Sequence, residues 1–257
     1  MPFTITHAVL APPLARLSGY WIPTAALAIG CMLPDLHRLF MSGLFPLAHQ
    51  WQGIWKFNLW LGLGFCLLWY GLLRPTFYDA LGIRHPLGLQ SVKTCLSFIV
   101  AMVIGLMLGN ATHLIWDGLT HVDSRTFAFH DFLSQRLQLG TQSYPVHRLL
   151  QVGTSILFLP VVLYMIGRYW RRYATGDVSK GRQLFFGVAA TAITILSLWS
   201  AIDYALYFNL SQWQYHTYYV TARCLNELFQ TGILLTIAVA ALYRLLCWGD
   251  VFEPIED

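Results

Sequence analysis

The stretch TCLSFIVAMVIGLMLGNATHLIW, at residues 94–116, decides the fold class. It contains no Asp, Glu, Lys or Arg. About 20 apolar residues in a helix cross the hydrocarbon core of a bilayer. A helix also satisfies its own backbone hydrogen bonds in lipid. The stretch is too long for a strand and therefore predicts a membrane-spanning helix.

Outward from this stretch, four more long apolar stretches follow the same rule, at residues 56–73, 149–167, 183–202 and 218–248. The chain is 56% hydrophobic and 11% charged, whereas soluble domains carry about 25% charged residues. We therefore predict an all-α, polytopic membrane helical bundle with about five transmembrane helices. No polar linker divides the sequence, which favours a single membrane-embedded domain over residues 1–257. The shorter apolar piece at 22–33 predicts a re-entrant or interfacial helical segment.

Basic residues indicate the orientation, because Lys and Arg concentrate in cytoplasmic loops. They cluster between the first and second spans, between the third and fourth, and at the end of the fifth. This pattern predicts a bacterial inner-membrane protein with a cytoplasmic C-terminus and with residues 119–146 and 208–217 in the periplasm. The net charge is +4, and the basic residues form no continuous stripe along the sequence. No nucleic-acid partner is therefore expected. The basic residues of these three clusters are Arg74, Arg84, Lys93, Arg168, Arg171, Arg172, Lys180, Arg182 and Arg244.

Histidines and one aspartate gather at the expected periplasmic ends of the spans. The second span ends in HLIWDGLTH, in which His113, Asp117 and His121 follow one another at intervals of four. Residues four apart share one face of a helix. His147 begins the third span and His49 precedes the first, so both reach the same side. Ionisable residues at membrane depth are costly and tend to mark function.

Two further candidates lie upstream, Asp35 after the short apolar piece and His7 near the start of the chain. Whether His7 joins the others depends on the path of residues 22–33. If that piece crosses the bilayer, His7 lies on the cytoplasmic side.

Five motifs in this order resemble the bacterial inner-membrane proteins described as predicted metal-dependent hydrolases, the YdjM-like group and its close relatives. The resemblance covers about residues 1–165 and leaves residues 166–257 as additional transmembrane helices. The motifs are MPFTITH at 1–7, GCMLPDL at 30–36, AHQWQG at 48–53, HLIWDGLTH at 113–121 and HRLLQVGTS at 147–155.

A more distant similarity is to the zinc-dependent phospholipase C and nuclease family. His113 and Asp117 match its His-x-x-x-Asp pair, His121 a further histidine, and His147 its second pair. Gln151 stands where that family has a carboxylate, and Asp117 and His121 are closer together than in the family, which favours one or two metal ions over three. From the position of these residues at one membrane face, we predict that the metal ligands come from His7, Asp35, His49, His113, Asp117, His121 and His147. Asp35 or Asp117 is alternatively predicted to act as general base.

Histidine with carboxylate suits zinc best among divalent metals. At the lipid–water boundary, the expected activity is metal-dependent hydrolysis of a lipid-linked or phospholipid phosphoester on the periplasmic face. Arg125, Arg136 and Arg223 are candidates for holding the phosphate, since guanidinium matches phosphate geometry.

Two alternatives stay open. One is a non-catalytic scaffold in which a structural metal joins helices. The other is a transporter that uses the histidines and Asp203 as a relay, although no internal repeat supports it. The G-x-x-x-G pattern of Gly105 and Gly109 predicts close helix packing.

Overall fold

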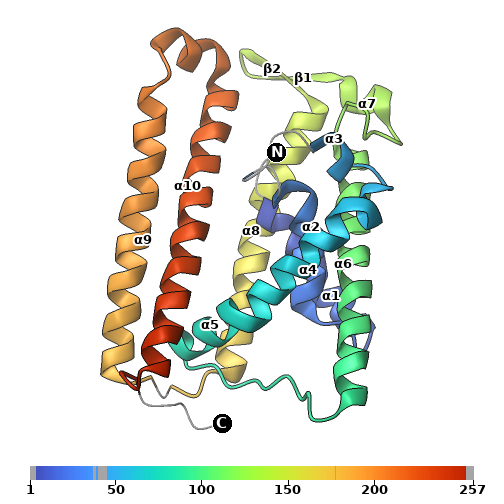
Figure 1. Cartoon of the computed structure of the whole chain (residues 1–257). Coiled ribbons are helices and arrows are strands. Elements are labelled where there is room, and N and C mark those ends of the chain that lie inside the picture. The colour runs from blue at the N-terminus through green and yellow to red at the C-terminus, as the bar shows by residue number, and fades with distance from the viewer. Residues whose placement is uncertain (1–3, 37–38, 40–44, 177, 253–257) are drawn as a thin grey trace. The chain divides into compact units, whose positions relative to one another are not determined.

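The computed structural model describes residues 4–36, 39, 45–176 and 178–252. Five helical segments are long and apolar enough to cross a membrane, which confirms the predicted all-α membrane bundle (Figure 1). They cover Ile54–Leu81, Val92–Thr120, Val146–Tyr173, Lys180–Leu206 and Leu210–Trp248.

Each observed segment includes its predicted span and extends beyond it. The first combines a π-helical turn η3 (Ile54–Asn58), α4 (Leu59–Leu68), a second π-helical turn η4 (Trp69–Leu73) and α5 (Arg74–Leu81). The others are α6 (Val92–Thr120), α8 (Val146–Tyr173), α9 (Lys180–Leu206) and α10 (Leu210–Trp248). Side-chain caps begin three of these helices, from Ser91, Ser179 and Asn209. Such caps satisfy the free N–H groups of the first turn.

The contacts group the chain into two compact units, and the single domain expected from the sequence stays a prediction. The first unit comprises Met1–Cys66 and Leu87–Tyr169, and the second comprises Leu67–Pro86 and Trp170–Asp257. In the second unit α9 packs against α10, where the Thr231 hydroxyl donates to the Ser200 hydroxyl at 3.0 Å. The Tyr243 hydroxyl in α10 donates to the Asp79 carboxylate in α5 at 3.2 Å.

The first unit begins with a helical hairpin, residues 4–36, which we call the N-terminal hairpin (Figure 1). One arm is η1 (Thr4–Leu10) with α1 (Ala11–Leu17), and the returning arm is α2 (Thr24–Leu36). Gly19 and Tyr20 take positive φ angles of 64° and 62° in the turn, a conformation that reverses the chain sharply. The short apolar piece predicted at 22–33 is therefore helical and forms the returning arm.

The N-terminal hairpin lies along α6 over much of the length of that helix. A Cβ added to Gly109 would lie 2.3 Å from the Leu27 carbonyl oxygen, so the two backbones are in direct contact. This contact confirms the close packing predicted from the G-x-x-x-G pattern.

The hairpin tip and the hairpin ends meet opposite ends of α6. Near the tip, Trp21 Nε1 donates to Ser97 Oγ at 3.0 Å. Near the end of the returning arm, the Cys31 carbonyl oxygen lies 2.8 Å from His113 Nδ1. Ser97 and His113 are about 24 Å apart along a helix. The hairpin thus runs at membrane depth and turns back, so that His7 and Asp35 lie at the His113 end.

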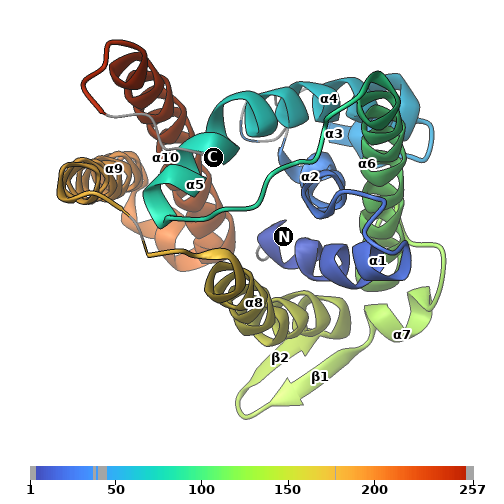
Figure 2. The ribbon, with the colours of Figure 1, turned by 90° about the horizontal axis from the view of Figure 1, so that it is seen from below.

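Short elements complete the first unit. α3 (Phe45–Ala48) precedes the first span. α7 (His130–Ser134) and the strands β1 (Arg136–Leu139) and β2 (Gln142–Pro145) connect α6 to α8. The strands pair antiparallel, and we call residues 136–145 the strand hairpin. Figure 2 shows it on the outer side of α7 and α8.

Candidate metal centre

The centre of the site is one face of α6 near its C-terminal end. His113 and Asp117 are one turn apart and both side chains are buried. His113 Nε2 lies 3.4 Å from Asp117 Oδ2. Their i, i+4 spacing therefore brings an imidazole nitrogen and a carboxylate oxygen together, as the sequence pattern predicts.

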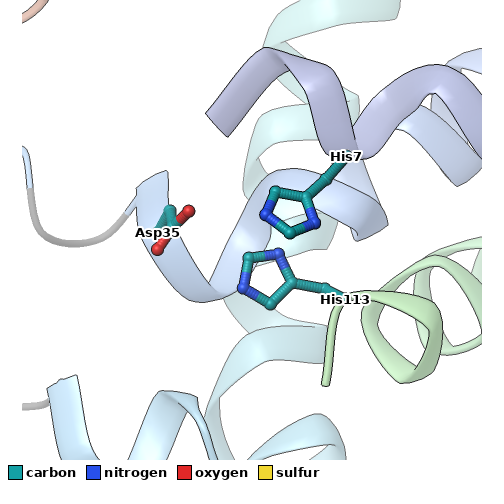
Figure 3. Close-up of side chains that lie close together, drawn as sticks. All are labelled: His7, Asp35 and His113. Carbon is teal, nitrogen blue, oxygen red and sulfur yellow. The ribbon is translucent and has the colours of Figure 1, made fainter. Parts of the chain in front are cut away.

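Three residues from other segments converge on this pair. His49, in the loop after α3, places Nε2 3.4 Å from Asp35 Oδ1 and 3.6 Å from Asp117 Oδ2. Asp35 comes from the end of α2 and His7 from η1. Figure 3 shows the His7 ring stacked on the His113 ring, with the Asp35 carboxylate beside them; the ring centroids are 4.1 Å apart.

These side chains form two overlapping groups of potential ligands. One group is His7, Asp35 and His113, and the other is His49, His113 and Asp117. Within each group the ligand atoms all lie within 4.8 Å of one another, and every member is buried.

Three of the separations match those between neighbouring ligands of a tetrahedral ion. Bonds of 2.0–2.1 Å to zinc place neighbouring ligand atoms about 3.3–3.4 Å apart. The contacts that link Asp35, His49, Asp117 and His113 in sequence measure 3.4, 3.6 and 3.4 Å. These contacts suit neighbouring ligands of one ion, and the groups whose ligand atoms all lie within 4.8 Å of one another place Asp35 with His7 and His113, and His49 with His113 and Asp117.

Several ligand atoms have no other use in the described part of the chain. Asp35 Oδ1, His113 Nε2 and Asp117 Oδ1 are buried and accept or donate no hydrogen bond there. Buried polar atoms without hydrogen bonds cost free energy and are rare. Two carboxylates beside several imidazoles are the kinds of ligand that a divalent cation binds.

Neighbouring groups orient the ligands. The bond between His113 Nδ1 and the Cys31 carbonyl directs the lone pair of Nε2 into the site, an arrangement common for metal-binding histidines. The Thr4 hydroxyl donates to Asp35 Oδ2 at 3.2 Å. Asn58 Nδ2 donates to the Ala48 carbonyl at 2.8 Å and supports the loop that carries His49.

Arg125 closes the site at the end of α6. One of its terminal nitrogens donates to Asp117 Oδ2 at 2.8 Å, and its Nε donates to Asp123 Oδ1 at 2.9 Å. This hydrogen bonding lowers the pKa of Asp123 to about 2. Arg125 therefore neutralises two carboxylates, a role different from the phosphate contact expected from the sequence.

His121 lies beside the cluster and belongs to neither ligand group. Its Nδ1 is 3.5 Å from Asp117 Oδ1 and 3.3 Å from the Thr120 hydroxyl. Burial lowers the pKa of His121 to about 4, so the ring is neutral at pH 7.

His147 also stands outside both groups of potential ligands found among the described residues. Its Nδ1 faces the Leu133 carbonyl at 3.3 Å. Gln151, one turn on, donates through Nε2 to the Thr120 carbonyl at 2.8 Å and so caps α6. The HRLLQ pattern thus joins α8 to the end of α6, and its predicted ligand role stays a prediction without geometric support.

The other two arginines expected at a phosphate have different neighbours. Arg136 Nε donates to Ser143 Oγ within the strand hairpin at 3.0 Å. Arg223 lies over the Tyr219 ring in the second unit, 5.1 Å from its centroid.

Sequence reasoning missed the supporting groups of the site. Thr4 and Cys31 lie within the motifs at 1–7 and 30–36, but nothing in those motifs marks the Thr4 hydroxyl or the Cys31 carbonyl as a supporting group. Asn58 left one signal, an amide at the start of an otherwise apolar span, which in lipid requires a partner.

Fold and site together define a multi-pass α-helical membrane protein with a buried histidine–aspartate cluster. The chain belongs to the DUF4184 family, a domain of unknown function, which matches residues 1–246. Comparisons with curated proteins and with solved structures gave no match. The family match covers both units of the fold.

Proposed function

We propose that this protein is a zinc-dependent hydrolase of lipid phosphoesters, with its site at the periplasmic face of a bacterial inner membrane. The observation that carries the proposal is the convergence of five buried side chains as two overlapping groups of potential ligands, His7, Asp35 and His113 in one and His49, His113 and Asp117 in the other. When bound, such an ion activates water as a nucleophile at neutral pH.

The two aspartates would have different chemical roles. Asp117 Oδ2 already accepts a hydrogen bond from the Arg125 cation, which makes that carboxylate a poor base. Asp35 Oδ2 accepts from the neutral Thr4 hydroxyl, and Asp35 Oδ1 lies 3.4 Å from His49 Nε2. We therefore assign Asp35 as the proton acceptor and Asp117 as a ligand, since a general base must keep an available lone pair.

The lipid nature of the substrate follows from the place of the site. Its residues lie near Thr120, the last residue of a helix long enough to cross a membrane. A substrate with a polar head and an apolar tail meets such a site without leaving the bilayer. The motif order shared with the YdjM-like proteins supports hydrolysis as the reaction class.

A structural metal site is the second candidate function, and one observation favours it. Four protein ligands would fill a tetrahedral zinc ion, whereas catalytic zinc keeps one position open. A metal held by Asp35, His49, His113 and Asp117 would join the N-terminal hairpin to α6 without any reaction.

Metal analysis of the purified protein tests the site. We expect about one or two zinc ions per chain, and almost none in the double variant His113→Ala, Asp117→Ala. The matched control is His130→Ala, Asp131→Ala, which removes an exposed pair of the same composition. Equal zinc content in the parent protein and both double variants would contradict a metal site at His113 and Asp117.

Activity then separates the two candidates. The metal-loaded protein is offered phospholipid and isoprenoid phosphoesters in vesicles, with and without chelator, and release of the phosphate-containing group is measured. Chelator-sensitive release that Asp35→Asn abolishes supports the hydrolase. Bound zinc without release from any of these esters supports the structural role.

A further inference from the structure

The connection between α6 and α8 carries an exposed apolar surface that the metal site does not use. It begins after Thr120 and ends at Val146, and both flanking helices are long enough to cross a membrane. The strand hairpin lies within this connection, at the same end of both helices (Figure 1). Its surroundings are therefore the boundary between lipid and water.

The strand hairpin has two chemically different faces. Its register pairs Leu137 with Tyr144 and Gln138 with Ser143. Directly opposite residues share a face, and successive residues alternate between faces. Leu137, Leu139 and Tyr144 thus lie on one face, together with Gln142 beside the turn.

The opposite face is polar. It carries Gln138, Ser143 and Arg136, and Arg136 Nε donates to Ser143 Oγ at 3.0 Å. A hairpin with one apolar and one polar face has the pattern of a segment that lies flat on a membrane.

The apolar face is not covered by the first unit. Leu137, Leu139 and Tyr144 keep 48%, 52% and 39% of their surface exposed. Nearby, Phe129 and Phe132 of the α7 region are 68% and 53% exposed. Isolated two-stranded hairpins are marginally stable in water, and aromatic side chains are enriched where membrane meets water.

We propose that residues 127–145 form a membrane-surface anchor, in which the apolar face of the strand hairpin lies in the outer part of the bilayer. The occupant of this face is the lipid itself, since the surface continues directly from two membrane-spanning helices. The inference goes beyond the proposed hydrolysis and does not depend on a bound metal.

The anchor is fastened to the start of α8. The Val146 amide donates to the Gln135 carbonyl at 2.8 Å, and His147 Nδ1 faces the Leu133 carbonyl at 3.3 Å. Leu133 itself is buried. His147 therefore acts as a positioning residue for the anchor.

Site-directed spin labelling in lipid nanodiscs tests the anchor on the full chain. The five native cysteines, all free, are replaced, and single cysteines are placed at Leu137, Leu139, Gln138 and Ser143. Collision rates with oxygen, which concentrates in lipid, and with chromium oxalate, which stays in water, are compared. Controls are Leu198 on a predicted lipid-facing span and Gln90 in an exposed loop.

We expect the oxygen-to-oxalate ratio at Leu137 and Leu139 to exceed that at Gln138 and Ser143 by roughly fivefold, as for a segment lying in the interface. High oxalate rates at all four positions would place the hairpin in water and overturn the proposal. Low rates with both reagents would indicate a protein cover and overturn it as well.

Hydrogen exchange of the unmodified protein provides a second measurement, which needs no cysteine replacement. In nanodiscs, the paired amides of residues 136–145 should exchange at least about tenfold more slowly than those of residues 87–91. Equal exchange in the two segments would show that the bilayer does not stabilise the hairpin and would contradict the anchor.

Discussion

His113 is held from both sides of its ring. Its Nδ1 faces a backbone carbonyl of α2, and its Nε2 faces Asp117. Helical periodicity predicted that His113 and Asp117 share a face. The carbonyl of Cys31 could not be predicted, because every residue carries a carbonyl and only the packing of α2 selects this one.

His147 shows the reverse case. Its spacing to Gln151 matched a metal-binding pattern, yet both side chains bond to backbone carbonyls at the ends of neighbouring elements. An i, i+4 pair fixes which residues share a face of a helix. It does not fix what that face meets, which here depends on the path of a connection with no strong sequence signal.

Asn58 supports the loop that carries His49, and its removal is a test at this scale. In Asn58→Leu the Ala48 carbonyl loses its donor. A buried carbonyl left without a partner costs about 1–3 kcal/mol, so the loop with His49 should loosen and zinc content should fall. Gln52→Leu in the same loop is the control, because Gln52 is exposed. Equal zinc in the two variants would deny Asn58 this role.

At the scale of elements, the apolar runs predicted the five spans but not their ends. The helices extend beyond the apolar runs into polar and aromatic residues, as in the first turns of α10. Such residues lower the mean hydropathy, so hydropathy alone does not predict these helix ends. The N-terminal hairpin was only partly foreseen. The apolar run at 22–33 predicts its returning arm. The first arm gives no such signal, because it combines a 3-10 helix with a short α-helix that contains two prolines.

Gly109 lies at a close contact between α2 and α6. In Gly109→Ala the new Cβ would lie 2.3 Å from the Leu27 carbonyl and 2.8 Å from the Cys31 amide nitrogen. The backbone of α2 must then move, at about 1–3 kcal/mol for overpacking. We expect lower thermal stability and reduced zinc content, because Asp35 lies near the end of the displaced helix α2.

Gly153→Ala is the matched control for this variant. Gly153 lies in α8, another apolar helix, and no atom approaches within 4 Å of its added Cβ. It should keep the stability and zinc content of the parent or gain slightly in stability, since Ala favours helix. A Gly109→Ala protein that behaves like this control would contradict the close packing of the N-terminal hairpin.

At the scale of the whole molecule, bound metal should stabilise the protein. An ion that binds only the native state adds about 2.7 kcal/mol at a hundredfold excess over its dissociation constant. Thermal unfolding in detergent should therefore shift upward with zinc and downward with chelator. The double variant His113→Ala, Asp117→Ala should respond to neither, and an equal response in it would assign the effect to other sites.

Sidedness is the second test at this scale. The basic loops predict that Ser124 faces the periplasm and Gln90 the cytoplasm, while the N-terminal hairpin returns Ile5 to the side of Ser124. Single cysteines at Ser124 and Ile5 should react with an impermeant maleimide in intact cells, and one at Gln90 only after permeabilisation. Labelling of Gln90 and Ser124 from the same side would contradict the alternating topology.

The bond between Cys31 and His113 joins residues 82 positions apart in the chain. The ribosome therefore completes both arms of the N-terminal hairpin long before their partner helix is synthesised. During that interval the nascent hairpin carries His7 and Asp35 without their histidine and carboxylate neighbours on α6. The contacts of the N-terminal hairpin with α6 therefore form only after α6 has been synthesised, and folding of the amino-terminal region is coupled to that of α6.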